Sequence, residues 1–283
     1  IEKRINFARK NSWNDRIVKL ENTIKHIAPP ISIVILCFNH WTETKRCIES
    51  VINNTKYDNY EIVVVNNNSS DETKENLKIF EKTENFVIVN CKKNYGFAGG
   101  MNIGALHCKH EYIILLNNDT IVTEEWLYPL IKPLILCNYG AGSPITNNCG
   151  NEAKQFIYHD NVPDLFKKAK ILQKNKQHKI TECFNVPFFC PALRKKDFFS
   201  IGMLDMNYNI GGWEDDDIME KLRIYNKNQN NYFTFGSFVY HMESLTVSDN
   251  NNDHYKENNN KLLFEKKWNK KWKPPKYSFE KIT

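Results

Sequence analysis

The side chains best suited to chemistry include a run of four acids. Residues 211–217 read Gly-Gly-Trp-Glu-Asp-Asp-Asp. Adjacent carboxylates repel one another unless a cation or a basic ligand compensates their charge. The acids also suit a helix N-terminus, which would be a purely structural role. A carboxylate beside flexible backbone and an aromatic ring could instead act as a general base toward a sugar hydroxyl.

Two further motifs could hold a metal ion. Asn117-Asn118-Asp119 follows an apolar run and offers hard oxygen ligands to a divalent cation, which can in turn neutralise diphosphate oxygens. His241 ends another apolar run and is a candidate ligand for manganese or a similar ion. Each motif alone has an ordinary explanation, because the first is common turn chemistry and a lone histidine is usually structural.

Strands and helices alternate at short spacing in the first half of the chain. Continuous β-branched runs predict buried strands, and periodic or capped segments predict helices. The expected strands are 31–38, 60–65, 86–89 and 112–116, and the expected helices are 42–52, 72–80 and one that opens within 96–104. This alternation predicts an α/β fold with a Rossmann-like, mostly parallel sheet flanked by helices.

Each of these strands ends in a polar cluster, at 39–40, 66–69, 94–96 and 117–119. Ligands of parallel sheets gather at the carboxyl ends of the strands, so the clusters predict a site for one large polar ligand. The glycine-rich turn lacks the Gly-x-Gly-x-x-Gly spacing and follows the third strand, which counts against a dehydrogenase. Its glycines still let the backbone approach a phosphate or a sugar closely.

The remaining segments are less regular. Residues 1–30 predict an amphipathic helical leader that ends at two prolines, and 167–179 indicate a basic, weakly structured connection. Strands are expected over 186–193 and 233–240, with a helix over 215–223 between them. The Asn-rich stretch 250–260 predicts a mobile loop.

Composition and charge describe a globular chain with a basic end. The net charge of the 283 residues is +6, and the eight Lys and two Glu from Lys261 onward account for all of it, so the rest of the chain is neutral. Such a tail can rest on an anionic membrane surface, but a terminal helix whose Trp268 and Trp272 pack back on the domain is the favoured interpretation. Nucleic acid is not expected as a partner. The eight cysteines form no Cys-x-x-Cys pair and are expected to be reduced.

No signal peptide or membrane-spanning run is visible. We therefore expect a cytoplasmic location, with a peripheral position at the inner face of the membrane as the alternative. The chain begins at Ile1 rather than at a methionine, which favours a piece of a longer, multidomain protein.

In order and together, these motifs resemble the family 2 glycosyltransferases, which have the GT-A fold. The resemblance spans roughly residues 31–248. It implies a GT-A domain with a nucleotide-binding half, 31–120, and an acceptor half, 121–248, between the leader 1–30 and the Asn-rich loop and basic tail, 249–283. The matching segments are 37–39, 64–71, 94–104, 116–119, 202–205, 214–217 and His241.

The resemblance also implies roles for individual residues. Asp215 would be the catalytic base, with Glu214 beside it, and Trp213 with Gly212 would position the acceptor. Asp119 and His241 would hold a divalent cation, Mn²⁺ or Mg²⁺. The nucleotide-sugar donor would lie against Phe38, Asn39, Asn66, Asn68, Asp71, Asn94, Gly96, Gly99, Asn117 and Asn118.

Two departures from the family pattern concern the donor. The family's usual Asp after the second strand is Asn66, and its Asp-x-Asp motif is Asn117-Asn118-Asp119, with one carboxylate lost. The latter form resembles the rhamnosyltransferase-like members, so dTDP-rhamnose is slightly favoured over UDP-GlcNAc or another UDP-hexose. One charge fewer predicts weaker metal affinity and reliance on the donor diphosphate.

The resemblance implies an inverting, metal-dependent transfer of a sugar to a hydroxyl of a glycan, a lipid-linked sugar or a glycoprotein. A sugar nucleotidyltransferase is one alternative, but it would need a basic glycine-rich loop after the first strand, where residues 39–42 read Asn-His-Trp-Thr. A non-catalytic carbohydrate-binding domain of transferase descent is the other. Retention of Glu214, Asp215, Asp119 and His241 argues against it.

Overall fold

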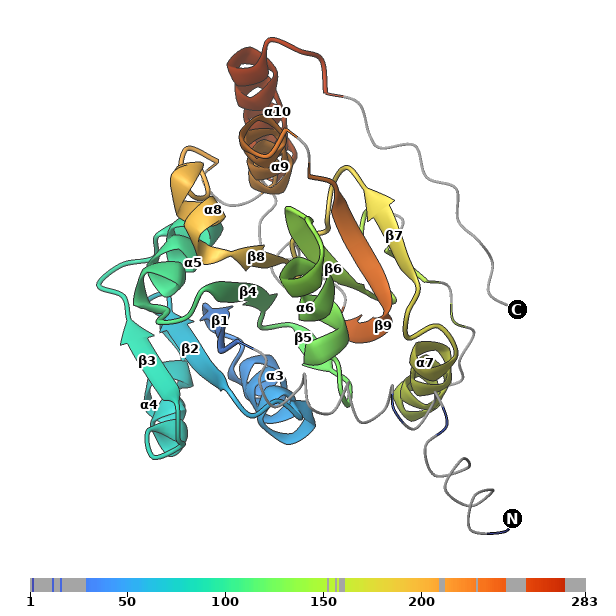
Figure 1. Ribbon diagram of the computed structural model, residues 1–283. Coiled ribbons are helices and arrows are strands. Elements are labelled where there is room, and N and C mark those ends of the chain that lie inside the picture. Colours follow the sequence, from blue (N-terminus) through green and yellow to red (C-terminus); the bar gives the residue numbers. More distant parts are fainter. Residues whose placement is uncertain are drawn as a thin grey trace.

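A computed structural model describes residues 29–151, 153–155, 157, 161–208, 212–227, 229–242 and 253–272, together with residues 2, 12 and 16 (Figure 1). Most of the expected leader, residues 243–252 and residues 273–283 lie outside the described residues. No helix within the described ranges is both long enough and apolar enough to cross a membrane.

The first half of the chain forms the expected parallel sheet. Strands β1 (Ile31–Cys37), β2 (Tyr60–Asn66), β3 (Phe86–Asn90) and β4 (Tyr112–Asn117) pair in the order β3-β2-β1-β4, all parallel. The connections carry α3 (Trp41–Asn54), α4 (Thr73–Asn76) with the 3₁₀ turn Leu77–Phe80, and α5 (Gly96–His107). The carboxyl ends of the four strands therefore share one edge, as predicted.

The second half extends this sheet to nine strands with mixed directions. Its strands are β5 (Thr120–Val122), β6 (Ala141–Ile145), β7 (Ile180–Cys183), β8 (Ala192–Arg194) and β9 (Asn231–His241). The order continues β4-β8-β6-β9-β5, and β7 pairs with β9. β8 is antiparallel to β4, whereas β6 and β9 are parallel to each other. The sheet is thus parallel over β1 to β4 and mixed beyond them.

The strand expected over 186–193 is wrong in its extent, because only Ala192–Arg194 is a strand. The backbone carbonyls of Phe189 and Pro191 do accept hydrogen bonds from β4, at 2.9 Å and 3.0 Å. Pro191 has no N–H to return, so a continuous ladder cannot form there. Residues 186 and 188–190 are buried all the same.

Two segments expected to be irregular are helices. α7 (Val162–Asn175) replaces most of the connection predicted over 167–179. The side chain of Asn161 caps this helix by accepting a hydrogen bond from the Asp164 N–H at 3.0 Å. Its buried face, Leu165, Ala169 and Leu172, packs on the β9 side of the sheet. α10 (Asp253–Trp268) replaces most of the loop predicted over 250–260. Tertiary packing overrides weak propensity there, because Phe264 is buried.

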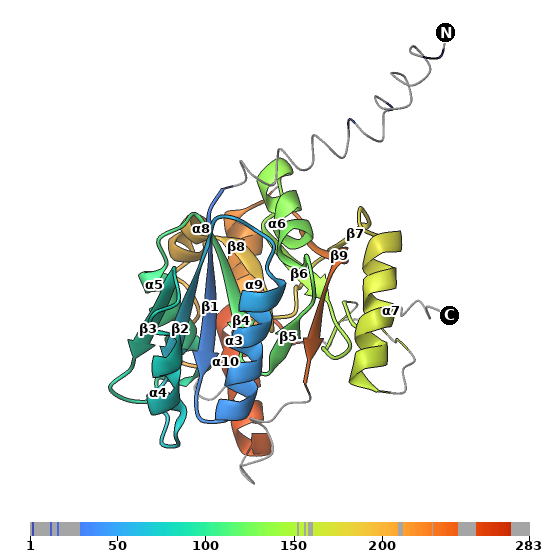
Figure 2. The ribbon, with the colours of Figure 1, turned by 90° about the horizontal axis from the view of Figure 1, so that it is seen from below.

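The core lies on both faces of the sheet (Figure 2). Alternate residues of β1, β2 and β4 pack against α3 and α6 (Leu127–Leu136) on one face. The other set packs against α5, α8 (Lys195–Ser200) and α9 (Glu214–Tyr225). A separate cluster joins α7 to β9. Burial on both faces explains why these strands are continuous apolar runs, and it leaves their polar ends as the place for a ligand.

Close packing of β6 on β9 predicts a sensitive position at Gly142. A Cβ atom there would lie 2.2 Å from the Tyr232 ring, whose carbon atoms belong to the buried core. We expect Gly142→Ala to lower the free energy of unfolding by about 1–3 kcal/mol, since the ring must move. Urea unfolding measures the change. Gly150→Ala, where a Cβ meets nothing within 4 Å, is the matched control, and equal stability of the two variants would contradict this packing.

Candidate active site

Asp119 and His241 meet at the edge where β4 ends. The antiparallel pairing of β5 with β9 sets Thr120 opposite His241, and the Met242 N–H donates to the Asp119 carbonyl at 2.9 Å. Asp119 Oδ1 consequently lies 3.3 Å from His241 Nε2. Two residues 122 positions apart in the chain are thus brought together by main-chain pairing.

The surroundings of His241 fix its ring. Nδ1 lies 2.9 Å from the Asn148 carbonyl oxygen, so this nitrogen carries the proton and Nε2 faces Asp119. The ring stacks on Phe189 with centroids 5.1 Å apart, and the Asn147 side chain bonds both backbone groups of His241. Burial alone would lower the pKa of His241, but Asp119 and the Asn148 carbonyl outweigh it and the net pKa is raised.

The oxygens beside His241 suit a cation. Asp119 is only 8% exposed and its buried Oδ1 has His241 Nε2 as its neighbour, whereas the buried Asn117 Oδ1 has no hydrogen-bond partner among the described residues. Unpaired buried oxygens are costly, and a divalent cation would satisfy them. Within the described ranges no three His, Cys, Asp or Glu side chains are placed to hold a metal ion together, so Asp119 and His241 would leave most coordination positions to the ligand. Asn118 turns away and donates to Thr44 Oγ1 at 2.9 Å.

The end of β1 builds one wall of the expected nucleotide site. Phe38 is 37% exposed at this edge, which leaves its ring available for stacking on a base. Asn39 has a left-handed φ of 56°, and its Oδ1 accepts the N–H of Ser70 at 2.8 Å. The Asp71 carboxylate accepts from the Thr73 N–H at 3.0 Å at the start of α4. Asn39 and Asp71 therefore shape the turn 69–73.

Asparagines at the ends of β2 and β3 hold the neighbouring loops together. Asn66 is 1% exposed, donates to Asn90 Oδ1 at 2.9 Å and accepts from the Ser69 N–H. Asn67 accepts from the Tyr95 N–H at 2.9 Å and donates to Asn94 Oδ1 at 2.8 Å. The sequence analysis included Asn67 only as a member of the cluster 66–69, without a role of its own, and missed Asn90. The position of both asparagines at strand ends could have indicated that they hold the neighbouring loops.

The other donor-side residues lie around the same turn. Asn68, with φ 65°, follows Asn67. Gly96, with φ 70°, begins α5, and its N–H donates to Asn94 Oδ1 at 2.8 Å. A Cβ at Gly99 would lie 2.7 Å from the Tyr95 side chain, so this glycine lets Tyr95 fold onto the helix. The N-terminus of α5 thereby opens toward the strand ends, where its amides favour an anion.

The four acids form the first turn of α9, as the structural interpretation of the sequence expected. Gly212 and Trp213 precede it with φ of 91° and 70°, both left-handed, and strain of this kind in a tryptophan persists only where its surroundings hold it. Burial, then the charge of Asp215, raises the pKa of Glu214 to about 8. Burial also raises the pKa of Asp215. A raised pKa suits a carboxylate that must accept a proton.

Asp216 and Asp217 differ from their neighbours because other elements bind them. Asp216 accepts from Asn185 at 2.6 Å and from Trp272 Nε1 at 2.7 Å. Asp217 accepts from Trp268 Nε1 at 2.9 Å. The two tryptophans of the basic tail therefore pack back on the domain, which confirms the favoured interpretation of that segment for its described part.

A loop that the sequence analysis did not single out joins the cation site to α9. The Asn148 carbonyl holds His241. Three residues further on, Asn151 donates to the Asn185 carbonyl at 3.0 Å, and the Asn185 side chain binds Asp216. The loop 147–151 thus ties both parts of the candidate site into one network.

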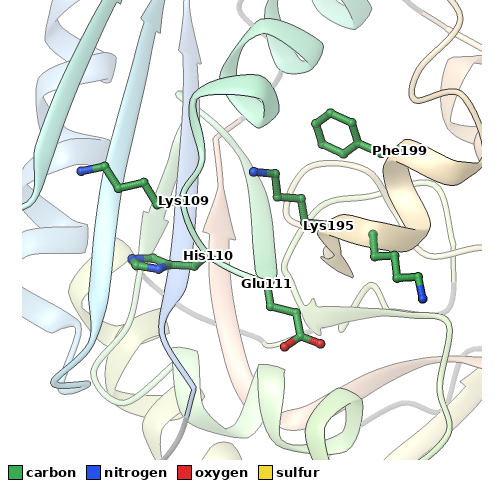
Figure 3. A pocket seen from close by; sticks show the side chains of 6 residues that line it. Lys109, His110, Glu111, Lys195 and Phe199 are labelled. Carbon is green, nitrogen blue, oxygen red and sulfur yellow. The ribbon is translucent and has the colours of Figure 1, made fainter.

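A shallow hollow elsewhere on the domain is not part of this site (Figure 3). It has a volume of about 440 Å³. Its lining comes from the residues just before β4 and from α8, at the opposite ends of the strands from Asp119. The lining residues are Lys109, His110, Glu111, Lys195, Lys196 and Phe199.

Comparison with known proteins agrees with this geometry. The model for the family described as glycosyl transferase family 2 matches residues 32–199, which is 168 of the 283 residues. The chain belongs to glycosyl transferase family 2. The matched range contains β1 to β4 with Asp119, whereas the acids of α9 and His241 lie beyond it.

Curated relatives share a part of the chain. The poly-beta-1,6-N-acetyl-D-glucosamine synthase of Staphylococcus aureus (strain COL) is 31% identical over 105 residues, and that of Staphylococcus epidermidis (strain ATCC 35984) is 29% identical over 102 residues. Each match covers 36% of this chain and 24% of the relative. The chain thus spans about a quarter of the length of these relatives.

Solved structures confirm the GT-A fold of this glycosyltransferase. GalNAc-T7 with UDP, GalNAc and Mn²⁺ superposes with a TM-score of 0.61 at 23% identity, covering 77% of this chain and 44% of that one. The mannosyltransferase PcManGT from Pyrobaculum calidifontis, in complex with GDP-Man and Mn²⁺, gives a TM-score of 0.61 at 14% identity, covering 87% and 66%.

The buried Glu214 predicts a pH-dependent stability of the ligand-free protein. Its pKa is about 8 in the fold against an ordinary value of 4.5, so the folded state binds the extra proton between these values. The free energy of unfolding should therefore fall as pH rises from about 4.5 to about 8. Relative to Glu214→Gln, the loss should be roughly 2 to 5 kcal/mol.

Urea unfolding at pH 5, 6, 7 and 8, without nucleotide or metal, measures this difference. Glu49→Gln, at a half-exposed carboxylate on α3, is the control and should follow the wild-type curve. Parallel curves for wild type and Glu214→Gln would show that Glu214 ionises freely.

Proposed function

We propose that this domain transfers a sugar, with inversion, from a nucleotide-diphospho-sugar to a hydroxyl of a glycan acceptor. The observation that carries the proposal is the Asp119–His241 pair at the end of β4, in which a buried carboxylate oxygen lies 3.3 Å from Nε2. Such a pair suits a cation held jointly with a diphosphate. The family match and the site support the same proposal. A nucleotide sugar releases an anionic diphosphate, and a cation at this edge would neutralise that charge.

Asp119 and His241 would hold the divalent cation, with the Asn117 amide oxygen beside them. The cation, when bound, supplies positive charge to the leaving diphosphate. Mn²⁺ is our first choice because both solved neighbours contain it with a nucleotide or nucleotide sugar. With only one protein carboxylate, the donor diphosphate must provide much of the affinity.

Asp215 is the proposed general base, and it removes the proton from the attacking acceptor hydroxyl. The helix start places it after Gly212 and Trp213, and its Oδ1 is oriented by the N–H of Asp216 at 2.9 Å. Its pKa is raised by burial, which increases its basicity. Glu214 is protonated near neutral pH because its pKa is about 8; it is therefore better suited to donate a hydrogen bond to the acceptor than to act as base.

The donor we favour is UDP-N-acetylglucosamine. Among the donors expected from the sequence, dTDP-rhamnose rested on the single Asn117-Asn118-Asp119 variation, and no relative named above supports it. The staphylococcal relatives are named as synthases of a poly-N-acetylglucosamine, which favours a UDP-GlcNAc donor and a glycan acceptor. The proposed class of reaction is the same for either donor.

The cation site makes a prediction about ligand binding. In the presence of Mn²⁺, UDP-GlcNAc at 100 times its Kd should add about 2.7 kcal/mol of stability and raise Tm. A thermal-shift panel with UDP-GlcNAc, other UDP-hexoses, GDP-mannose and dTDP-rhamnose measures the preference. Asp119→Ala should lose the manganese-dependent part of the shift, because His241 alone would remain.

Asp58→Asn, at an exposed turn, is the control for this panel and should keep the full shift. Calorimetric titration with UDP and Mn²⁺ gives a second measure. If Asp119→Ala binds UDP with unchanged dependence on Mn²⁺, the cation lies elsewhere.

The base assignment makes a separate prediction about turnover. Asp215→Asn keeps the shape of the side chain but cannot take a proton, so kcat should fall at least ~100-fold. Donor binding should be unchanged, because Asp215 does not touch the diphosphate in this scheme. Release of UDP from UDP-GlcNAc with a glycan acceptor measures kcat, and near-normal turnover would remove Asp215 from this role.

A further inference from the structure

Residues 267–272, called the C-terminal segment below, lie against the acid-rich start of α9, where α10 stacks on that helix (Figure 1). Lys267 Nζ lies 2.6 Å from the Asp205 carboxylate and 2.8 Å from that of Asp217. Trp268 Nε1 donates to the same Asp217 carboxylate at 2.9 Å, and Lys270 pairs with Glu220 one turn further along α9. The segment therefore compensates the fully buried Asp217 with charge and with an indole donor.

Trp272 ends this segment with two contacts of a different kind. Its Nε1 donates to Asp216 Oδ2 at 2.7 Å. Its ring meets that of Trp213 edge to face, with centroids 5.6 Å apart at 67°. Because Asn185 binds the other oxygen of Asp216 at 2.6 Å, the Asp216 carboxylate is held from two sides and cannot rotate freely.

These contacts divide the four acids into two pairs. Asp216 and Asp217 are bound by the C-terminal segment. Glu214 Oε2 has no hydrogen-bond partner within the described ranges, and neither has the buried Trp213 Nε1. The Trp213 indole can donate a hydrogen bond and the Glu214 carboxyl group can donate or accept one, so these two adjacent residues suit a sugar, whose hydroxyls do both. Trp213 Nε1 and Glu214 Oε2 are thus buried polar atoms without an internal partner among the described residues, while Asp216, which follows Asp215, is fixed by Asn185 and Trp272.

We propose that Trp272 is a positioning residue of the transfer reaction, which holds Asp216 and the Trp213 ring and thereby orients Glu214 and Asp215 toward the acceptor. The inference rests on the proposed function and adds a residue from outside the family-matched range. Asp215 Oδ1 accepts from the Asp216 N–H, so a shift of Asp216 moves the base. Small displacements of a reacting group can cost about 100-fold in rate.

The test compares Trp272→Phe with wild type. Phenylalanine keeps an aromatic ring against Trp213 but removes the donor to Asp216. We expect kcat for UDP-GlcNAc turnover with Mn²⁺ to fall at least ~10-fold, with the calorimetric Kd for UDP–Mn²⁺ and the Tm unchanged. Lys271→Ala is the matched control, because its side chain is 85% exposed and pairs only with Glu265 among the described residues; its kcat should equal that of wild type.

Asp216→Asn supplies an independent variant if Trp272→Phe does not fold. An amide has one acceptor oxygen, so it cannot bind Asn185 and Trp272 as the carboxylate does, and kcat should fall similarly. Where both fold, the double variant should lose little more than either single variant, since both break the same contact.

The outcomes separate the two hypotheses. If wild type turns over donor and Trp272→Phe retains kcat within twofold, the positioning role is overturned while the proposed function stands. A parallel loss of kcat, UDP affinity and Tm would assign Trp272 to stability alone, which also overturns it. If wild type neither binds nor hydrolyses any donor of the panel, the proposed function itself fails and the inference falls with it.

Discussion

The candidate site depends on one short antiparallel pairing, that of β5 with β9. Three residue pairs join these strands, and they bring the end of β4 against the end of the longest strand. The Asp119–His241 contact is a direct result. Phe189, whose carbonyl accepts from the Asn117 N–H, stacks on the histidine ring that this pairing brings into place. Without the pairing, the end of β4 would lack the contact between Asp119 and His241.

The site combines two solutions to the problem of buried charge. At the strand edge, the Asp119 carboxylate faces His241 and the buried Asn117 amide oxygen has no partner among the described residues, which suits the cation proposed above. On α9, part of the charge is compensated internally by lysines and indoles, and part is suppressed by protonation, since the pKa of Glu214 is raised to about 8. For Asp216, burial and then the charge of Asp215 raise the pKa, and the Trp272 hydrogen bond opposes them. Both solutions leave specific atoms free for a ligand.

Sequence reasoning succeeded where one physical signal dominated. The runs Ile31 to Cys37 and Tyr112 to Leu116 are buried on both faces, so continuous apolar residues identify them as strands. It failed where packing overrides propensity. α10 begins among asparagines but is anchored by Phe264, and β5, β6 and β8 are too short for periodicity. The roles of Asn67, Asn148 and Asn185 depend on partners 27 to 93 residues away, which no local pattern encodes.

The order in which a chain is synthesised gives the α9–C-terminal contacts a further consequence. The N-terminal part of a protein leaves the ribosome first, and domains fold during synthesis. Residues 214–217 are therefore made about fifty residues before Lys267, Trp268 and Trp272, which is several seconds at about 5–20 residues per second. During that interval Asp217 has only Lys221 from its own helix as a cationic partner among the described residues made so far. The C-terminal segment completes the acid cluster, so in the nascent domain the parallel strands β1 to β4 are made before the start of α9 acquires these partners.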